Sequence, residues 1–209
     1  MLTVVCVKSR PAYDHHYVNR LYRAVESHLT IPHRFVCFTD NAEGVQCPTK
    51  PLPAGHRKGW YAKLALHRPG LLTPPVLYLD LDTLITDSLD FIASYSGEFS
   101  ILRDFYRPHG YGSGVMIWRK PQPQVWERWV EADEPEHVLG DQGWMEECVP
   151  NADRLQDIYP GKFVSYKVHC QSGLPPEAAV CCFHGFPKPH DFPVGHWVTE
   201  HWTGVGVTA

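Results

Sequence analysis

The hydrophobic pattern near the start of the chain predicts a strand, a helix and a strand in that order. Residues 2–7 form an apolar, β-branched run that is typical of a buried strand. Apolar positions then recur at helical spacing over residues 14–29. Residues 34–38 form a second apolar run, which ends at the turn-forming residues 39–41. This order predicts two parallel strands joined by a right-handed crossover.

The rest of the chain continues as a mixture of strands and helices. Hydrophobic runs predict strands at residues 76–79, 99–102, 115–118, 163–168 and 180–183. Helical patterns predict helices at residues 60–67, 121–131 and 142–148, the second with a proline at its start. Neither an internal repeat nor a convincing linker interrupts the chain. We therefore predict a single α/β domain over residues 1–209 with a mixed central sheet.

Composition limits the classes of protein that this chain can represent. It is 44% hydrophobic and 20% charged, with a net charge of −4 and no run of Lys or Arg. These values do not indicate a broad surface for nucleic acid or anionic membrane, although they leave room for a local basic groove. No stretch approaches the roughly 18 apolar residues of a transmembrane helix, and residues 1–10 lack the apolar core of a signal peptide. We expect no nucleic-acid partner and no transmembrane segment.

The cysteines favour a reducing compartment. The chain has seven, an odd number, and their scattered positions match neither a disulfide framework nor a zinc motif. Cys181 and Cys182 are adjacent within an apolar run, which favours buried structural thiols. We therefore expect a soluble, cytoplasmic protein.

Two carboxylates at the end of one predicted strand are the first candidates for chemistry. Asp80 and Asp82 follow the apolar run of residues 76–79. Ligands of open α/β sheets bind outside the carboxyl ends of the strands, and paired carboxylates there suit Mg²⁺ or Mn²⁺ carrying a phosphate. The alternative is an ordinary strand followed by an acidic turn, because short acidic triplets are common.

Five short segments, taken in order, resemble one family. They are Tyr61-Ala62-Lys63-Leu64, Leu77-Tyr78-Leu79-Asp80-Leu81-Asp82-Thr83, Gly112-Ser113-Gly114-Val115-Met116-Ile117, Asp141-Gln142-Gly143 and His184-Gly185-Phe186-Pro187-Lys188-Pro189. This order resembles the GT-A glycosyltransferases of family 8, which include glycogenin and bacterial galactosyltransferases. The resemblance covers residues 2–189. It implies a single GT-A, Rossmann-like domain, a nucleotide-sugar donor (usually a UDP-sugar), Mn²⁺ or Mg²⁺, and retaining transfer to an acceptor that the sequence does not identify.

The resemblance implies a metal and diphosphate site. In such a site Asp80 and Asp82 hold a hard cation that bridges the two donor phosphates, and His184 is the third metal ligand. Lys63 and Lys188 add positive charge at the same diphosphate, where Lys188 also acts in catalysis by stabilising the charge that develops as the sugar bond breaks. The alternative for both lysines is an ordinary solvated side chain.

The resemblance also implies contacts to the rest of the donor. Tyr13 falls where the family places an aromatic residue that stacks on uracil. The alternative is that Tyr13 is simply the aromatic residue at the start of the first helix. Asp40, after the second strand, and Gly185, in the C-terminal motif, are the other expected donor contacts.

Three polar residues match family positions near the reacting sugar. Asp104 matches a carboxylate that contacts the donor sugar, unless it forms a salt bridge with Arg103 or Arg107. Asp141 and Gln142 match a pair near the anomeric carbon, where a carboxylate and an amide can orient hydroxyls and support an oxocarbenium-like centre. Asp141 also has the residue type and place of a helix N-cap, and it can serve both roles.

The chain departs from the family pattern at two places. Gly112 stands where the family usually has asparagine, so any contact of that side chain is lost or replaced. The family's metal-binding histidine lies three residues before the glycine of the C-terminal motif, where this chain has Cys182. Its own histidine, His184, directly precedes Gly185. A shift of two residues keeps a side chain on the same face of a strand, so we still expect His184 to reach the metal.

Two other functions fit parts of the sequence. In a haloacid-dehalogenase-like phosphatase, Asp80 would be the nucleophile and Asp82 the acid/base, and Gly140-Asp141 with Glu146 would imitate the acidic metal motif. Against this reading, a complete β-α-β unit precedes Asp80, and residues 133–137 are too polar for the buried strand that should precede the acidic motif. The third possibility is a non-catalytic nucleotide-sugar-binding module.

Overall fold

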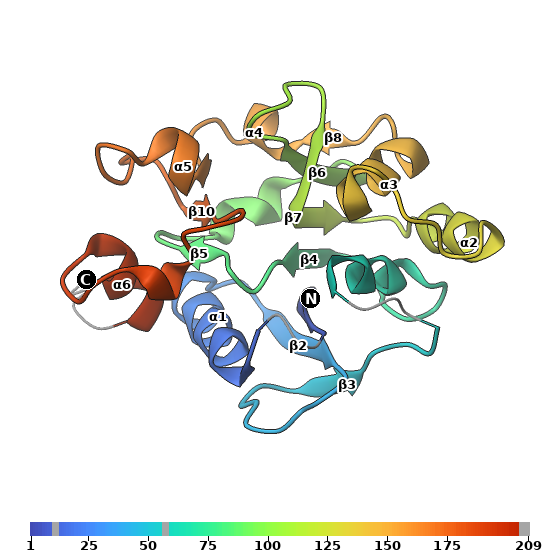
Figure 1. The fold of residues 1–209 in the computed structure, drawn as a ribbon, viewed down its shortest axis with the longest axis horizontal. Helices are drawn as coiled ribbons and strands as arrows, with labels where there is room; N and C mark the ends of the chain where they lie inside the picture. Colours follow the sequence, from blue (N-terminus) through green and yellow to red (C-terminus); the bar gives the residue numbers. More distant parts are fainter. Residues whose placement is uncertain (10–12, 56–58, 205–209) are drawn as a thin grey trace.

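A computed structural model describes residues 1–9, 13–55 and 59–204. Seven strands form its central sheet: β1 (Leu2–Lys8), β2 (His33–Thr39), β3 (Thr49–Pro51), β4 (Val76–Leu79), β6 (Phe99–Arg103), β7 (Tyr111–Trp118) and β8 (Asp153–Arg154). They lie in the order β3-β2-β1-β4-β7-β6-β8 (Figure 1). β1 is parallel to β2 and β4, whereas β4 is antiparallel to β7. The predicted α/β class and mixed sheet are confirmed.

A second, small sheet stands beside the first. It contains β5 (Leu84–Ile85), β9 (Phe163–Ser165) and β10 (Val180–Cys182), in the order β5-β10-β9. The strand predicted over residues 163–168 is therefore too long. It ends at Ser165, where the short helix α5 (Tyr166–His169) begins, because the Ser165 side chain accepts a hydrogen bond from the backbone N–H of Val168.

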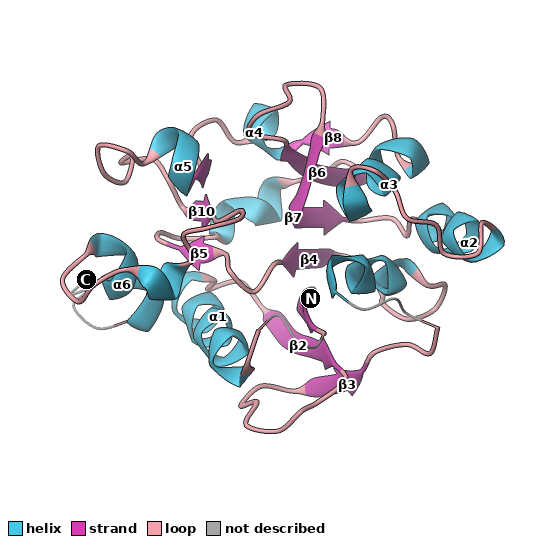
Figure 2. Cartoon of the chain, in the orientation of Figure 1, coloured by secondary structure: helices cyan, strands magenta, loops and turns pink. Residues whose placement is uncertain are grey.

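The helices cover the sheet on both sides (Figure 2). They are α1 (His15–His28), α2 (Pro123–Glu131), α3 (Gly140–Cys148), α4 (Leu155–Ile158) and α6 (Trp197–Thr203), with 3₁₀ segments η1 (Gly59–His67), η2 (Asp90–Ser94) and η3 (Pro189–Asp191). The predicted helix at residues 60–67 is thus a 3₁₀ segment. The helices predicted to begin at residues 121 and 142 begin at Pro123 and Gly140. No helix in the described part of the chain is both long and apolar enough to span a bilayer.

Two hydrophobic cores pack against the two faces of the sheet. On β1, Val4 and Cys6 join the core that contains α1, whereas Val5 joins the core built from η1, α2 and α3. β4 divides in the same way, with Leu79 in the first core and Tyr78 in the second. Because both faces are covered, these strands are apolar along their length, which is why they were recognisable as short hydrophobic runs. All seven cysteines are buried and free of disulfides, and the burial predicted for Cys181 and Cys182 is confirmed.

One histidine in the second core is unusual. His67 ends η1, is 4% exposed, and has its ring 4.9 Å from that of Trp118 and 6.0 Å from that of Phe99, measured between centroids. Neither of its ring nitrogens has a hydrogen-bond partner among the described residues. Burial lowers the pKa of His67 to about 3. The folded protein therefore holds this imidazole neutral.

This burial predicts a specific loss of stability in acid. Because the pKa of His67 is lower in the folded than in the unfolded chain, acidification from about pH 6.5 toward 3 favours unfolding. The residue should contribute a slope of up to about 1.4 kcal/mol per pH unit in that window. Urea unfolding of the wild-type protein and of His67→Phe at pH 7, 6 and 5 measures this slope. The wild type should lose stability relative to the variant as the pH falls; a constant difference between the two would contradict the assignment.

Candidate active site

The carboxyl ends of β1 and β4 open into a cavity of about 880 Å³. Ten of the residues predicted for the site line it: Tyr13, Lys63, Asp80, Asp82, Asp104, Asp141, Gln142, His184, Gly185 and Lys188. These residues come from segments that are far apart in the sequence, so the fold brings the predicted motifs together. Asp40 is the exception. It follows β2, is exposed, and is not among the described residues that line the cavity.

Asp80 directly follows β4 and is fixed there by hydrogen bonds that involve its backbone N–H and one carboxylate oxygen. Its N–H donates to the carbonyl oxygen of Gly114 on β7, at 2.8 Å. Its Oδ1 accepts from Lys63 Nζ at 2.8 Å and from the Tyr78 hydroxyl at 2.5 Å. Gly114 also lies close to the other carboxylate oxygen, since a Cβ there would be 3.4 Å from Asp80 Oδ2, an ordinary van der Waals distance.

Lys63 is buried and lies between two carboxylates. Its ammonium is 2.8 Å from Asp80 Oδ1 and 3.3 Å from Asp141 Oδ2, and it also donates to Ser113 Oγ at 3.2 Å. Burial by itself would lower the pKa of Lys63, but the charges of Asp141 and Asp80 outweigh it and raise the pKa. The alternative of a solvated lysine is wrong, because the residue is only 5% exposed.

Asp82 has its own pair of partners. Its Oδ2 accepts from Lys188 Nζ at 2.5 Å and from the Tyr13 hydroxyl at 2.8 Å. Burial and the negative charge of Asp80 raise the pKa of Asp82, against the opposing effects of Lys188 and Tyr13. Asp80, Asp82 and Asp141 share two lysines, Lys63 and Lys188, so this group has one more carboxylate than ammonium. A divalent cation between Asp80 and Asp82 would supply the missing positive charge, so the acidic pair fits a hard metal ion.

The structure does not place His184 as a third ligand. The His184 Nε2 atom lies 2.6 Å from Ser165 Oγ, and the ring packs beside Phe105 and Tyr106, at centroid distances of 6.0 and 5.1 Å. Over residues 1–9, 13–55 and 59–204, no three His, Cys, Asp or Glu side chains are grouped closely enough to hold a metal. The structure therefore does not group His184 with Asp80 and Asp82 as three ligands, and its role in metal binding stays a prediction. His184 lines the same cavity.

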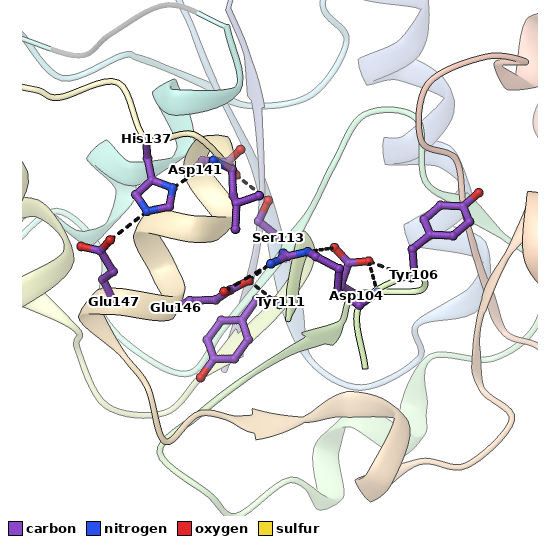
Figure 3. Close-up of polar contacts among 10 residues, drawn as sticks. Asp104, Tyr106, Tyr111, Ser113, His137, Asp141, Glu146 and Glu147 are labelled. Atoms are coloured by element: carbon purple, nitrogen blue, oxygen red, sulfur yellow. Dashed lines mark hydrogen bonds and ion pairs between the residues drawn. The ribbon is translucent and has the colours of Figure 1, made fainter. Parts of the chain in front are cut away.

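Asp104 forms an ion pair with Arg107, one of the two salt bridges given above as alternatives to a sugar contact. Its Oδ2 is 3.2 Å from Arg107 Nε, and its Oδ1 accepts the backbone N–H groups of Tyr106 and Arg107 at 2.8 and 3.1 Å (Figure 3). Arg103, the other predicted partner, pairs with Asp157 instead. These bonds fix the Asp104 carboxylate while it still lines the cavity, so the ion pair and a substrate contact are compatible.

Asp141 is not a helix N-cap. It lies in the first turn of α3, whose N-cap position is Leu139 and has no side-chain cap. The Asp141 carboxylate instead accepts from Ser113 Oγ at 2.5 Å (Figure 3) and pairs with Lys63. Gln142, the next residue, also lines the cavity. The start of α3 thus presents a fixed carboxylate and an amide to the site.

The phosphatase alternative does not fit this structure. Glu146, which its acidic motif needs, accepts from Arg107 Nη2 at 2.7 Å and from the backbone N–H of Tyr111 at 2.8 Å. Glu146 is absent from the described residues that line the cavity. The β4 strand that carries Asp80 also follows a complete β1–α1–β2 unit. Asp80 therefore does not end the first strand, as the nucleophile of that superfamily does.

Sequence reasoning missed contacts by which three residues hold the site together. Tyr78 lies two residues before Asp80, on the same side of the strand, so the period of a strand could have indicated its contact with Asp80. The contacts of Ser113 with Asp141 and of Arg107 with Glu146 carry no local signal, because these partners are 28 and 39 residues away. Only the pairing of Arg107 with Asp104 was among the expected alternatives. Gly112, the departure from the family pattern, lines the cavity without a side chain.

Comparison with known proteins identifies the fold. No family model and no curated protein matches the chain. Among solved structures, the glycosyltransferase GlyE of Streptococcus pneumoniae TIGR4 is similar over 99% of this chain and 60% of its own, with TM-score 0.74 and 17% identity. The galactosyltransferase LgtC, solved with donor and acceptor sugar analogues, is similar over 99% and 97%, with TM-score 0.65 and 15% identity. The bifunctional glycosyltransferase WbbM is similar over 90% of this chain and 46% of its own, with TM-score 0.65 and 12% identity.

These similarities confirm the predicted GT-A fold. At identities of 12–17% they establish the fold and not the activity. The chain spans about three fifths of the length of GlyE and almost all of LgtC. The residues that line the cavity must therefore carry any argument about function.

The buried lysine generates the first prediction for the site. Lys63→Met leaves the Asp80 and Asp141 carboxylates without their shared cation and should cost about 3–5 kcal/mol of the free energy of unfolding. Lys120→Met is the matched control, since Lys120 pairs with Glu98 at the exposed surface and should cost less than about 1 kcal/mol. Urea unfolding measures both.

A double variant separates charge from packing. Lys63→Met combined with Asp141→Asn removes one unpaired carboxylate, so its loss should be smaller than the sum of the two single losses. Two results would contradict the organising role of Lys63. One is that the stability losses of Lys63→Met and Asp141→Asn are strictly additive in the double variant. The other is that Lys63→Met is no less stable than Lys120→Met.

Proposed function

We propose that this protein is a metal-dependent glycosyltransferase that moves a sugar from a nucleoside-diphosphate sugar, specifically a UDP-sugar, to an acceptor with retention of the anomeric configuration. The observation that carries the proposal is the cavity at the carboxyl ends of β1 and β4. There a GT-A fold gathers paired carboxylates, two lysines, an aromatic ring and an amide. GlyE, LgtC and WbbM, which share the fold, are glycosyltransferases.

The diphosphate part of the proposed site is built from Asp80, Asp82 and Lys188. The two carboxylates would hold Mn²⁺ or Mg²⁺, which would neutralise the phosphates and stabilise the leaving nucleoside diphosphate. Lys188 Nζ, 2.5 Å from Asp82 Oδ2, stands where it can add a further positive charge to the same group. Tyr13 lies against this pair, with its ring 5.7 Å from Lys188 Nζ, and lines the cavity where a base could stack.

The sugar part of the proposed site is built from Asp104, Asp141 and Gln142. Both carboxylates are held by fixed partners, Arg107 for the first and Lys63 with Ser113 for the second. Carboxylates held in this way can orient hydroxyl groups and support positive charge at an anomeric centre without first reorganising. The anomeric outcome rests on the resemblance to a retaining family.

Turnover of nucleotide sugars tests the proposal. Incubated with UDP-sugars and Mn²⁺, the protein should release UDP slowly even without an acceptor, because water can replace it. Lys188→Ala should lower this rate about 10²–10³-fold, whereas Lys120→Ala, at the exposed surface, should leave it unchanged. NMR of the first-formed sugar should show retention of the donor configuration.

Three outcomes would contradict the proposal. If the protein released phosphate from simple phosphomonoesters and consumed no nucleotide sugar, the phosphatase function would be supported instead. UDP binding without any turnover would indicate a non-catalytic binding module. An inverted first product would refute retention while leaving transfer intact.

A further inference from the structure

Two large aromatic side chains line the cavity but remain mostly open to solvent. Trp60, on η1, is 66% exposed, and Tyr106, after β6, is 64% exposed. Trp118, Trp129 and Trp144, by contrast, are at most 5% exposed and belong to the second hydrophobic core. An aromatic ring left open at the wall of a cavity is an available surface for a ligand.

Trp60 stands beside the start of α3. A Cβ on Gly140 would lie 3.4 Å from Trp60 Nε1, an ordinary van der Waals distance, so the indole lies close to the first turn of the helix. Asp141 and Gln142 are the next two residues of that turn and line the same cavity. The Trp60 ring therefore adjoins the proposed sugar site.

Tyr106 stands beside Asp104. Its backbone N–H donates to Asp104 Oδ1 at 2.8 Å, and its ring lies edge-on to His184 at 5.1 Å. His184 is itself held by Ser165 Oγ at 2.6 Å. In Figure 3 the Tyr106 ring extends away from Asp104, on the side opposite Asp141. Tyr106 and the turn of α3 that Trp60 covers therefore lie on either side of the Asp104 carboxylate.

The chemistry between these two rings suits a sugar. A pyranose has an apolar face of C–H groups, which stacks on an aromatic ring, and an edge of hydroxyl groups, which needs hydrogen-bonding partners. The cavity that Trp60 and Tyr106 line has such partners, namely the Asp104 carboxylate, the Gln142 amide and the His184 imidazole. A purely hydrocarbon ligand could not hydrogen-bond to these polar groups in place of the water that it displaces, at a cost in affinity.

We propose that Trp60 and Tyr106 form an acceptor subsite that binds a pyranose by stacking, so that the acceptor of the reaction is a saccharide. This inference rests on the proposed function, because only a second sugar next to the donor gives the subsite a role. It assigns His184 to the acceptor side of the cavity as a partner for hydroxyl groups.

Saturation-transfer NMR tests this proposal without requiring turnover. The probes are the methyl glycosides of glucose, galactose and N-acetylglucosamine, together with maltose, cellobiose, lactose and octyl glucoside. Each probe is measured with the protein alone and with Mn²⁺ plus UDP. At least one should receive saturation on the protons of one ring face. Trp60→Ala and Tyr106→Ala should each weaken its binding about 3- to 10-fold.

Conservative variants and a remote control make the result specific. Trp60→Phe and Tyr106→Phe keep a ring and should bind the same probe within about 3-fold of the wild type. Val194→Ala, which removes a 96% exposed apolar side chain that does not line the cavity, should leave binding unchanged.

The two proposals fail in different ways. UDP titration of the wild-type protein in the same samples reports the donor site separately. Any one of three results would overturn the acceptor subsite. The protein could bind UDP while no saccharide ring receives saturation, or only the octyl chain of octyl glucoside could receive it. The third such result is that the alanine variants bind the probe as the wild type does. The opposite result is a protein that does not bind UDP but binds a saccharide, with the alanine variants losing that binding. It would support the acceptor subsite and refute the proposed donor site.

Discussion

The arrangement of the cavity depends on the buried ammonium of Lys63. It lies between Asp80 at the end of β4 and Asp141 at the start of α3, and it also donates to Ser113 on β7. These contacts connect η1, β4, β7 and α3 through one charge. Without it, Asp141 would be an uncompensated buried charge, and the partly exposed Asp80 would lose the cation that binds its Oδ1. The candidate site therefore begins with an electrostatic constraint on four elements of the fold.

A second ion pair, between Asp82 and Lys188, connects the same region to the C-terminal part of the chain. Lys188 precedes η3, 106 residues after Asp82. The two members of the acidic pair, Asp80 and Asp82, each have a lysine as partner. Under the proposed function, donor phosphates and a metal would compete for these partners. Lys188, whose side chain is 16% exposed against 6% for Lys63, is the lysine with more freedom to turn from Asp82 toward a diphosphate.

The sequence predicted the strands that are buried on both faces, because burial makes them continuous hydrophobic runs. It did not predict the elements whose positions depend on partners distant in the sequence. The strands on either side of the first crossover and the strand before Asp80 were predictable because both faces of the sheet are covered. β3, β5 and β8 have two or three residues each, which is too short for any periodicity. Their positions are set by pairing with longer strands.

The same limit explains the outcome for His184. Cys182 and His184 both line the cavity, but Phe183 between them does so too, so the alternation of a strand is not kept there. The reason is that β10 ends at Cys182, so the argument from strand faces does not extend to residue 184. The parallel pairing of β10 with β9 places Cys182 opposite Ser165, and Ser165 is the residue that His184 then contacts. That register is not visible in either segment alone.

The most direct test of the account is a crystal structure with Mn²⁺ and UDP, in which anomalous scattering locates the manganese. The account predicts one manganese bound by carboxylate oxygens of Asp80 and Asp82 and bridging the two phosphates. It also predicts that the Lys188 ammonium has turned from Asp82 to the diphosphate. Manganese at any other position, or UDP bound in this cavity with no metal contact to either carboxylate, would contradict the central claim that the acidic pair after β4 is the donor's metal site.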